Sequence, residues 1–209
     1  MSIKKIVISN FRCFESVDLE FSELNNFIYG ANGSGKTSVL EALYFCSTGR
    51  SFKSSNKNLC IQNNKEAFKI QVDTSDNNKI CILKEAKKSI SLEINEGKAT
   101  SIELFRAIPS TLLDNKTFSM FADTPKYRRK ILDRCLMASD KNYSKDFFSF
   151  HRSLKQRNAA LKFKRLTNID MWSEIFINSG TLISEKRNSF FQETKQTFFQ
   201  FAKNLKDKR

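Results

Sequence analysis

The chain has 209 residues, of which 40% are hydrophobic and 12% aromatic, a composition that supports a buried core and excludes disorder throughout. Its formal net charge is +14, and the excess is uneven: residues 141–209 hold 15 Lys and Arg against 6 Asp and Glu, and residues 1–140 hold 21 against 16. This charge favours a polyanionic partner such as nucleic acid, because neutralising phosphates releases counterions. The alternative interpretation is an ordinary solvated surface.

The cysteines and the N-terminus indicate the compartment. Five scattered cysteines form no CxxC pair, and His151 is the only histidine, which gives little support to a zinc site or a Cys–His catalytic pair. Unpaired cysteines are typical of a reducing environment, so we expect a cytoplasmic protein. The N-terminus has no signal-peptide pattern, and no apolar run approaches the ~20 residues of a membrane span, so no membrane partner is expected.

The N-terminal third predicts strands around one helix. Residues 3–8 and 15–21 alternate in polarity and predict two strands, and residues 27–29 predict a short buried strand that runs into Gly30. Apolar residues at helical spacing after Lys36 predict a helix that ends near Gly49.

Three further strands are predicted at residues 67–73, 79–84 and 89–95, separated by turn residues, and they favour an antiparallel meander. Residues 101–106 predict one helical turn.

The C-terminal third predicts long helices. Thr124 is a suitable N-cap and Pro125 a suitable first residue for a helix over 126–137. Residues 143–165 and 171–206 predict two longer helices, and their short connection favours an antiparallel pair. In the last helix, Phe and Ile recur seven residues apart in two series. That spacing indicates a packing stripe or, alternatively, a coiled-coil arm. The residues are Phe176, Ile183 and Phe190, then Phe191, Phe198 and Leu205.

One segment carries a complete phosphate-binding motif, G-x-x-x-x-G-K-[ST], between a predicted strand and a predicted helix. Its glycines allow a tight turn whose N–H groups face phosphate oxygens, and the helix N-terminus favours the same anion. Lys36 is expected to reach the β- and γ-phosphates, and Thr37 to bind Mg²⁺, so ATP and Mg²⁺ are the expected cofactors. The nucleotide-binding residues predicted here are Gly30, Ala31, Asn32, Gly33, Ser34, Gly35, Lys36 and Thr37.

Two residues of this region have two interpretations each. Asn32 either hydrogen-bonds a phosphate or stabilises the turn. Arg12 either contacts nucleotide from the end of the first strand or is solvated.

Three blocks in order resemble the RecF family of bacterial recombination-repair ATPases. The first block comprises Asn10-Phe11-Arg12, the phosphate-binding segment up to Tyr44, and residues 49–53. The second is Pro125 to Asp133, similar to P-x-x-R-R-x-hydrophobic-L-D, and the third is Leu154 to Leu161, similar to L-K-Q-R-N-x-x-L. The resemblance covers residues 1 to about 165.

The resemblance implies an α/β fold: a P-loop ABC-type ATPase head, with a mixed sheet around the P-loop helix, and a second, mainly helical lobe. We expect the N-terminal part of the head at residues 1–106 and a basic helical lobe at 107–209. The resemblance also implies DNA replication and repair work in gap repair and the SOS response, ATP-dependent homodimerisation, and partner recombination mediator proteins. It carries Arg12 over as a nucleotide contact.

DNA, single-stranded or linear double-stranded, is the expected macromolecular partner. The basic blocks of the C-terminal third supply candidate phosphate contacts, whose alternative roles are a solvated helix face or, for Arg128 and Arg129, support of the ATP site or of lobe packing. The DNA-binding candidates are Lys126, Arg128, Arg129, Lys155, Arg157, Lys162, Lys164 and Arg165. No base-reading motif supports sequence-specific recognition.

Two motifs that the family uses for hydrolysis are not found in these 209 residues: the ABC signature and Walker B, the acidic strand end that positions Mg²⁺ and water. We therefore expect weak nucleotide binding and almost no hydrolysis, assign no catalytic residue, and read the chain as the N-terminal part of a RecF-like protein. The competing hypotheses are a basic DNA-binding module with a vestigial nucleotide site and an unrelated P-loop enzyme such as a small kinase.

Overall fold

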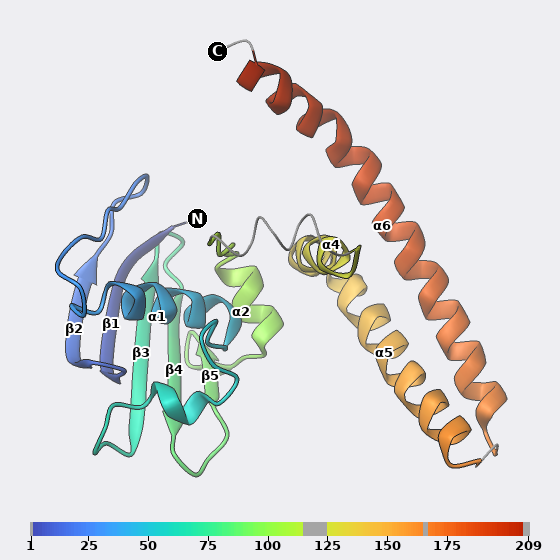
Figure 1. Ribbon diagram of the computed structural model, residues 1–209, viewed down its shortest axis with the longest axis horizontal. Helices are drawn as coiled ribbons and strands as arrows, with labels where there is room; N and C mark the ends of the chain where they lie inside the picture. Colours follow the sequence, from blue (N-terminus) through green and yellow to red (C-terminus); the bar gives the residue numbers. More distant parts are fainter. Residues whose placement is uncertain (1, 115–124, 165–166, 207–209) are drawn as a thin grey trace. The chain divides into compact units, whose positions relative to one another are not determined.

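The computed structural model describes the whole chain except residues 1, 115–124, 165–166 and 207–209 (Figure 1). The chain divides into two compact units, Met1–Leu113 and Asp114–Arg209, called here the sheet unit and the helical unit and described separately. The division falls after Leu113, whereas the sequence placed it after residue 106. α2 (Ser101–Ala107) packs against α1 (Lys36–Thr48) and belongs to the sheet unit.

The sheet unit contains one six-stranded sheet of order β2-β1-β3-β4-β5-β6. Its strands are β1 (Ile3–Phe11), β2 (Phe14–Glu20), β3 (Ala67–Thr74), β4 (Lys79–Glu85), β5 (Ser91–Ile94) and β6 (Gly97–Lys98). The five strands predicted over residues 3–21 and 67–95, and their meander, are confirmed. A mixed sheet was expected, but every strand pair of the described residues is antiparallel.

The core of the sheet unit lies between the sheet and α1, which crosses one face of the strands (Figure 1). Alternate residues of β3 are buried, as a sheet with one covered face requires. Phe11, Phe45 and Phe68 meet edge-to-face at centroid distances of 5.0 to 6.1 Å. This aromatic cluster fixes α1 over β1 and β3, and so fixes the loop that precedes α1.

The predicted strand at residues 27–29 is wrong. These residues have no regular secondary structure, and the side chains of Phe27 and Tyr29 are 86% and 91% exposed. A strand needs a neighbour to pair its backbone groups, and none of the six described strands pairs with this segment.

The helical unit contains α4 (Pro125–Ser139), α5 (Lys141–Lys162) and α6 (Ile169–Lys206). Pro125 begins α4 as predicted, whereas Thr124, the predicted N-cap, lies outside the described residues. Arg157 contacts Ser173 and Asp146 contacts Lys186, so residue numbers rise along one helix as they fall along the other. This register confirms the antiparallel pair (Figure 1).

The seven-residue stripe on α6 packs only in its first half. Phe176 stacks on Phe150 with centroids 4.9 Å apart, and Ile183 is 2% exposed. Phe191 and Phe198 are 50% and 70% exposed, so a packing role is wrong for them within this unit. In the antiparallel register, α5 begins opposite the region of Lys186, and the rest of α6 extends beyond it. The side chain of Leu205 lies outside the described residues.

Within the described part of the chain, no helix is long and apolar enough to cross a membrane.

Candidate functional site

The loop before α1 has the backbone that a phosphate-binding turn requires. Gly30, Gly33 and Gly35 have φ angles of +149°, +84° and +94°, which L side chains rarely adopt. At Gly35 a Cβ atom would also lie 2.4 Å from the ring of Phe14 and 3.0 Å from the sulfur of Cys13. Gly35 is therefore required both by its φ angle and by the close approach of the β1–β2 turn.

The N-terminus of α1 presents unused hydrogen-bond donors to this loop. No hydrogen bond among the described residues uses the amide N–H of Gly35, Lys36 or Thr37, or the Thr37 hydroxyl. Gly35 is the N-cap residue and supplies no side-chain cap. Free N–H groups and the positive end of the helix dipole together favour an anion here.

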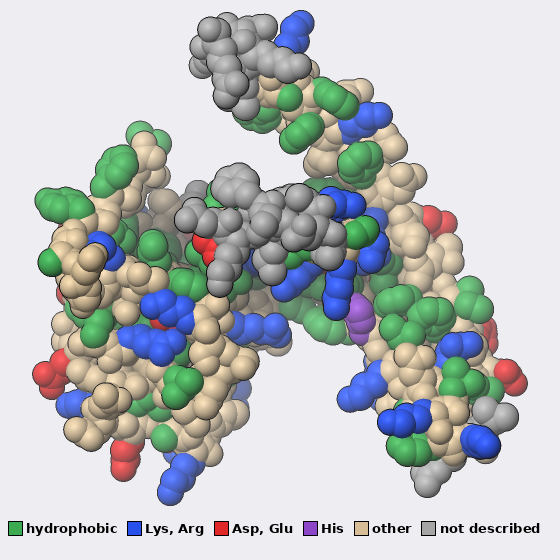
Figure 2. All heavy atoms as spheres, in the orientation of Figure 1, with side chains coloured by type: hydrophobic (Ala, Val, Ile, Leu, Met, Phe, Trp, Pro, Cys, Tyr) green, Lys and Arg blue, Asp and Glu red, His purple; other side chains and the backbone are tan. Residues whose placement is uncertain are grey.

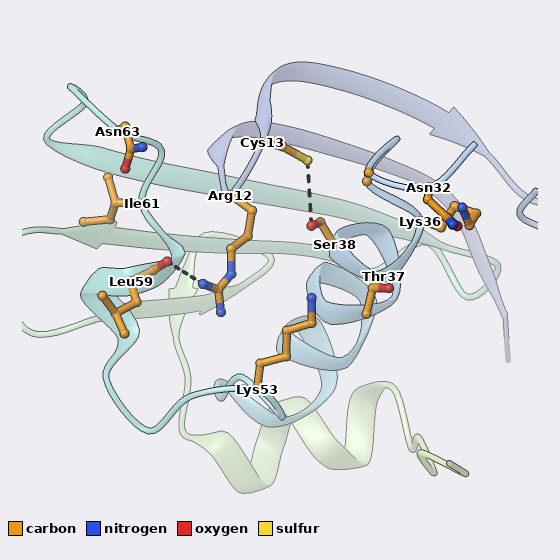
Figure 3. Close-up of a pocket in the computed structure, with 12 residues that line it drawn as sticks. Arg12, Cys13, Asn32, Lys36, Thr37, Ser38, Lys53, Leu59, Ile61 and Asn63 are labelled. Carbon is orange, nitrogen blue, oxygen red and sulfur yellow. Dashed lines mark hydrogen bonds between the residues drawn. The ribbon is translucent and has the colours of Figure 1, made fainter. Parts of the chain in front are cut away.

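Lys36 lies over its own loop. Its Nζ donates hydrogen bonds to the carbonyl oxygens of Gly30 and Ala31, at 2.8 and 2.7 Å. Figure 3 shows it beside Asn32, with Thr37 on the first turn of the helix. The ammonium group contacts neutral carbonyls, and no carboxylate of the described residues pairs with it, so its charge remains available to an anion.

A pocket of about 630 Å³ opens beside this loop (Figure 3), within the range of roughly 300–1,000 Å³ typical of ligand sites. One wall is the phosphate-binding loop, and the opposite wall comes from residues 53–63. The residues that line it are Arg12, Cys13, Asn32, Gly33, Gly35, Lys36, Thr37, Ser38, Lys53, Leu59, Ile61 and Asn63. The structure thus brings Arg12, Asn32, Lys36 and Thr37 together around one pocket.

Arg12 is held at the pocket by a buried carboxylate. Its Nε and Nη2 donate to the two oxygens of Glu41 at 3.0 and 2.6 Å, and its Nη1 donates to the Leu59 carbonyl at 2.6 Å. The Glu41 side chain is fully buried and also accepts a hydrogen bond of 2.5 Å from Ser51. Arg12 is therefore neither simply solvated nor loosely placed.

The ionisation of this pair follows from its contacts. Burial alone would raise the pKa of Glu41, but the hydrogen bonds from Arg12 and Ser51 outweigh burial and lower it. The hydrogen bond to Glu41 raises the pKa of Arg12. Both groups are charged at neutral pH, and the carboxylate fixes the guanidinium in one orientation.

The sequence missed Glu41, Lys53 and the wall at residues 59–63. Glu41 sits on a helix whose apolar residues carried the helical prediction, and its partner Arg12 is 29 positions away. The segment after Gly49 has no periodic pattern. No local signal in the sequence indicated these contacts.

The DNA-binding candidates of the helical unit are spread over α4 and α5. Most are exposed, namely Lys126, Arg128, Arg129, Lys155, Lys162 and Lys164. Arg157 is half-buried and donates from Nε to the Ser173 hydroxyl at 3.2 Å. Arg165 lies outside the described residues.

The acidic residues near these candidates are engaged elsewhere. Asp140 and Asp146 bind Lys186 at 2.9 and 3.1 Å, and Asp133 binds Arg187 at 2.7 Å. Figure 2 accordingly shows Lys and Arg side chains over the visible face of this unit, with few Asp or Glu between them. In the part of the chain that the structure describes, Lys155 and Lys162 on the exposed surface of α5 make no ion pair.

A comparison with protein families matches residues 5–209 to the AAA domain. The chain belongs to this AAA domain family. The match covers both units, so the helical unit is part of the family's domain.

Curated relatives extend the comparison. The chain is 35% identical over 207 residues to the DNA replication and repair protein RecF of Pseudoalteromonas translucida, covering 95% of this chain and 57% of that protein. It is 30% identical to RecF of Lachnoclostridium phytofermentans, covering 99% of this chain and 60% of that protein. The resemblance to RecF is confirmed, and the chain spans a little more than half the length of these relatives.

Solved structures confirm the fold class. The structure of the recombination mediator protein RecF-ATPrS in the RecFOR pathway superposes with a TM-score of 0.88 at 27% identity, covering 98% of this chain and 58% of that one. An Smc head domain with an extended coiled coil from Pyrococcus furiosus superposes at 0.53 with 17% identity. The latter likeness shows the fold alone: an ATPase head with a helical lobe.

Proposed function

We propose that this chain binds ATP with Mg²⁺ in the pocket beside Gly30 to Thr37. The observation that carries the proposal is the set of unused N–H groups at Gly35, Lys36 and Thr37, facing a loop of positive-φ glycines. Phosphate oxygens are negatively charged hydrogen-bond acceptors and therefore match these three N–H donors. The RecF relatives and the RecF-ATPrS structure support the choice of ATP.

Each side chain of the pocket has a role that its contacts suit. Lys36 exchanges its two carbonyl contacts for phosphate oxygens, which are stronger acceptors because they are charged. Thr37 offers its free hydroxyl to Mg²⁺, which neutralises phosphate charge when bound. Arg12 keeps one unused N–H on each of Nη1 and Nη2, because a guanidinium has five donors and three are engaged.

Substitution of Lys36 tests the nucleotide site. We expect Lys36→Ala to weaken binding of a fluorescent ATP analogue roughly 10- to 100-fold, the loss of one charge-assisted contact. Thr37→Ala should remove most of the difference between binding with Mg²⁺ and with EDTA. Lys87→Ala, which removes an exposed lysine from the β4–β5 turn, is the matched control. Equal affinity of Lys36→Ala and wild type would overturn the proposal.

We also propose a DNA replication and repair function in the cytoplasm, with DNA bound by the basic face of the helical unit. The support is the exposed positive charge of Lys155 and Lys162 on α5, which no ion pair of the described residues neutralises, and the likeness to the RecF DNA replication and repair proteins. Single-stranded and linear double-stranded DNA, gap and SOS repair, recombination mediator partners and ATP-dependent homodimerisation belong to this proposal. A DNA-binding module with a vestigial nucleotide site is the alternative.

The salt dependence of DNA binding tests the basic face. Lys155 and Lys162 lie seven residues apart on α5, hence on one side of the helix. Reversing both to Glu should flatten the slope of log affinity against log salt by roughly 2 or more. Reversing Lys87 and Lys98 of the sheet unit changes net charge equally and is the control. An unchanged slope for the α5 variant rejects the assignment.

The effect of ATP on DNA binding tests the alternative function. DNA binding that is independent of ATP favours the DNA-binding module with a vestigial nucleotide site.

Hydrolysis is proposed to be nearly absent from this chain, because no signature or Walker B segment is found in its sequence. The wild-type chain should release phosphate from ATP no faster than the Lys36→Ala variant does. A rate far above that of the variant would overturn this part of the proposal.

A further inference from the structure

A second pocket, of about 420 Å³, lies on the sheet unit in the loop that follows α1. Three basic side chains line it, Arg50, Lys53 and Lys57, together with serine hydroxyls. No Asp or Glu is among its lining residues. The P-loop and its glycines take no part in it, so it is distinct from the nucleotide pocket, although Lys53 borders both.

The three cations are not neutralised. Among the residues that the structure describes, none of the three makes an ion pair. The charge of Lys53 contributes to the lowered pKa of Glu41. The Glu41 carboxylate, however, already accepts hydrogen bonds from Arg12 and Ser51, so it does not pair with Lys53. Positive charges gathered without a counter-charge repel each other, and an anion in the pocket relieves that repulsion.

Burial and the neighbouring cations disfavour the charge of Lys57 in the same direction. The side chain is half-buried in the short helix Lys57–Cys60, and burial lowers its pKa, with Arg50 and Lys84 lowering it further. Lys84 adds positive charge near Lys57, and its own Nζ donates to the carbonyl oxygens of Glu85 and Lys88.

The loop that carries these side chains is internally fixed. The Ser51 hydroxyl accepts the N–H groups of Lys53 and Ser54 at 2.9 and 3.0 Å while donating to Glu41. Asn56 caps the short helix by accepting the N–H of Asn58 at 3.1 Å. A pre-ordered loop lowers the entropy cost of gathering several donors around one ligand.

We infer that this pocket binds a phosphate group, and that the phosphate belongs to a nucleic-acid backbone. Arg50 and Lys53 are exposed at the pocket, so a phosphodiester can reach them while the rest of its polymer stays outside. The inference rests on the proposed DNA binding and adds a contact on the sheet unit to the helical candidates.

The test removes the two cations that do not line the nucleotide pocket. In the full 209-residue chain, Arg50→Ala with Lys57→Ala is compared with wild type and with Lys87→Ala, Lys98→Ala, a pair of exposed lysines in the same unit. We expect the affinity for a labelled oligonucleotide to fall about 10-fold or more and the salt slope to fall by about 2. The control and the affinity for the ATP analogue should not change, and equal thermal midpoints would show that the variant is folded.

Other outcomes decide against the inference in separable ways. If wild type binds the oligonucleotide and the Arg50, Lys57 variant binds equally well with the same slope, the inference fails and the proposed DNA function stands. If wild type binds no oligonucleotide, neither this pocket nor the basic face of the helical unit is a nucleic-acid site. Titration of isotope-labelled protein with inorganic phosphate then identifies the source: shifts at the Arg50 side chain that are absent from Lys98 would show a site for free phosphate instead.

Discussion

The two units each bury a carboxylate that binds an arginine with both oxygens. In the sheet unit, the two carboxylate oxygens of Glu41 accept hydrogen bonds of 2.6 and 3.0 Å from Nη2 and Nε of Arg12. In the helical unit, the two carboxylate oxygens of Asp133 accept hydrogen bonds of 2.7 and 2.9 Å from Nε and Nη2 of Arg187. Both carboxylates take a third hydrogen bond from a hydroxyl: Ser51 donates to Glu41, and Tyr143 donates to Asp133 at 2.5 Å.

The pairs differ in what the arginine faces. Arg12 lines the pocket beside the phosphate-binding loop, whereas Arg187 joins α6 to α4, and Tyr143 adds α5 to the same cluster. The same ion pair therefore orients a binding group in one unit and ties three helices in the other. The residue types of the two ion pairs do not distinguish these roles. The roles differ because the two arginines have different neighbours.

The largest effect is expected in the helical unit. Asp133→Ala removes the whole buried carboxylate, leaves the half-buried Arg187 without its counter-charge and takes the partner from Tyr143. It should therefore lower the free energy of unfolding by about 3–5 kcal/mol. Trp172 on α6 is the only tryptophan of the chain, so its fluorescence during urea unfolding reports this unit. Affinity for the ATP analogue should not change. A nucleotide defect of this variant would break the comparison.

Glu41→Gln should act on the other unit and on both properties. It keeps the volume of the side chain but removes the charge that holds Arg12. We expect a loss of about 3 kcal/mol, at the low end for a broken buried pair, because the glutamine amide oxygen can still accept one hydrogen bond from Arg12. Nucleotide affinity should fall as well, because Arg12 loses its orientation.

Circular dichroism together with analogue binding measures both effects of Glu41→Gln. Glu15→Gln is the control, because Glu15 forms an exposed pair with Lys65, and such pairs contribute about 0–1 kcal/mol. If Glu41→Gln lost stability but kept full nucleotide affinity, Arg12 would have the same structural role as Arg187.

A smaller effect isolates the hydroxyl in the helical cluster. Tyr143→Phe keeps the buried ring and leaves Asp133 bound to Arg187, so it should cost only about 1–2 kcal/mol, one buried hydrogen bond. Trp172 fluorescence again reads the change. A loss as large as that of Asp133→Ala would mean that the hydroxyl, and not the ion pair, dominates the cluster.

The contrast between the pairs also explains how far the sequence predicts this molecule. The phosphate-binding loop was found because Gly30 to Thr37 carry their chemistry in eight consecutive residues, and β3 and α5 because polarity repeats within each. The Glu41–Arg12 and Asp133–Arg187 pairs join residues 29 and 54 positions apart, so no local pattern contains them.

The wrong predictions have the same cause. Residues 27–29 have the composition of a strand, and Phe198 has the spacing of a packing stripe. A strand and a stripe each need a partner, and the described residues supply none to either.

The smallest expected effect concerns the ion pair of Asp140 and Lys186 in the helical unit, and it depends on pH. The hydrogen bond from Lys186 lowers the pKa of Asp140, so its contribution to stability is present above the unfolded pKa of about 4 and is lost as pH falls through the folded value. Asp140 also caps α5 by accepting the N–H of Asn142 at 2.7 Å, and asparagine caps equally well. Asp140→Asn therefore removes the charge and keeps the cap.

We expect Asp140→Asn to cost about 0.5 kcal/mol at pH 7, the scale of an exposed pair, because Lys186 retains Asp146 at 3.1 Å. The difference from wild type should be full at pH 7 and should shrink as pH falls below about 4 toward the lowered folded pKa of Asp140. Urea unfolding followed by Trp172 at pH 7, 5 and 3 measures it. The absence of any difference across this range would assign the role of Asp140 to capping alone, because the variant keeps the cap, and would confine the stabilising charged contacts of the helical unit to its buried pair.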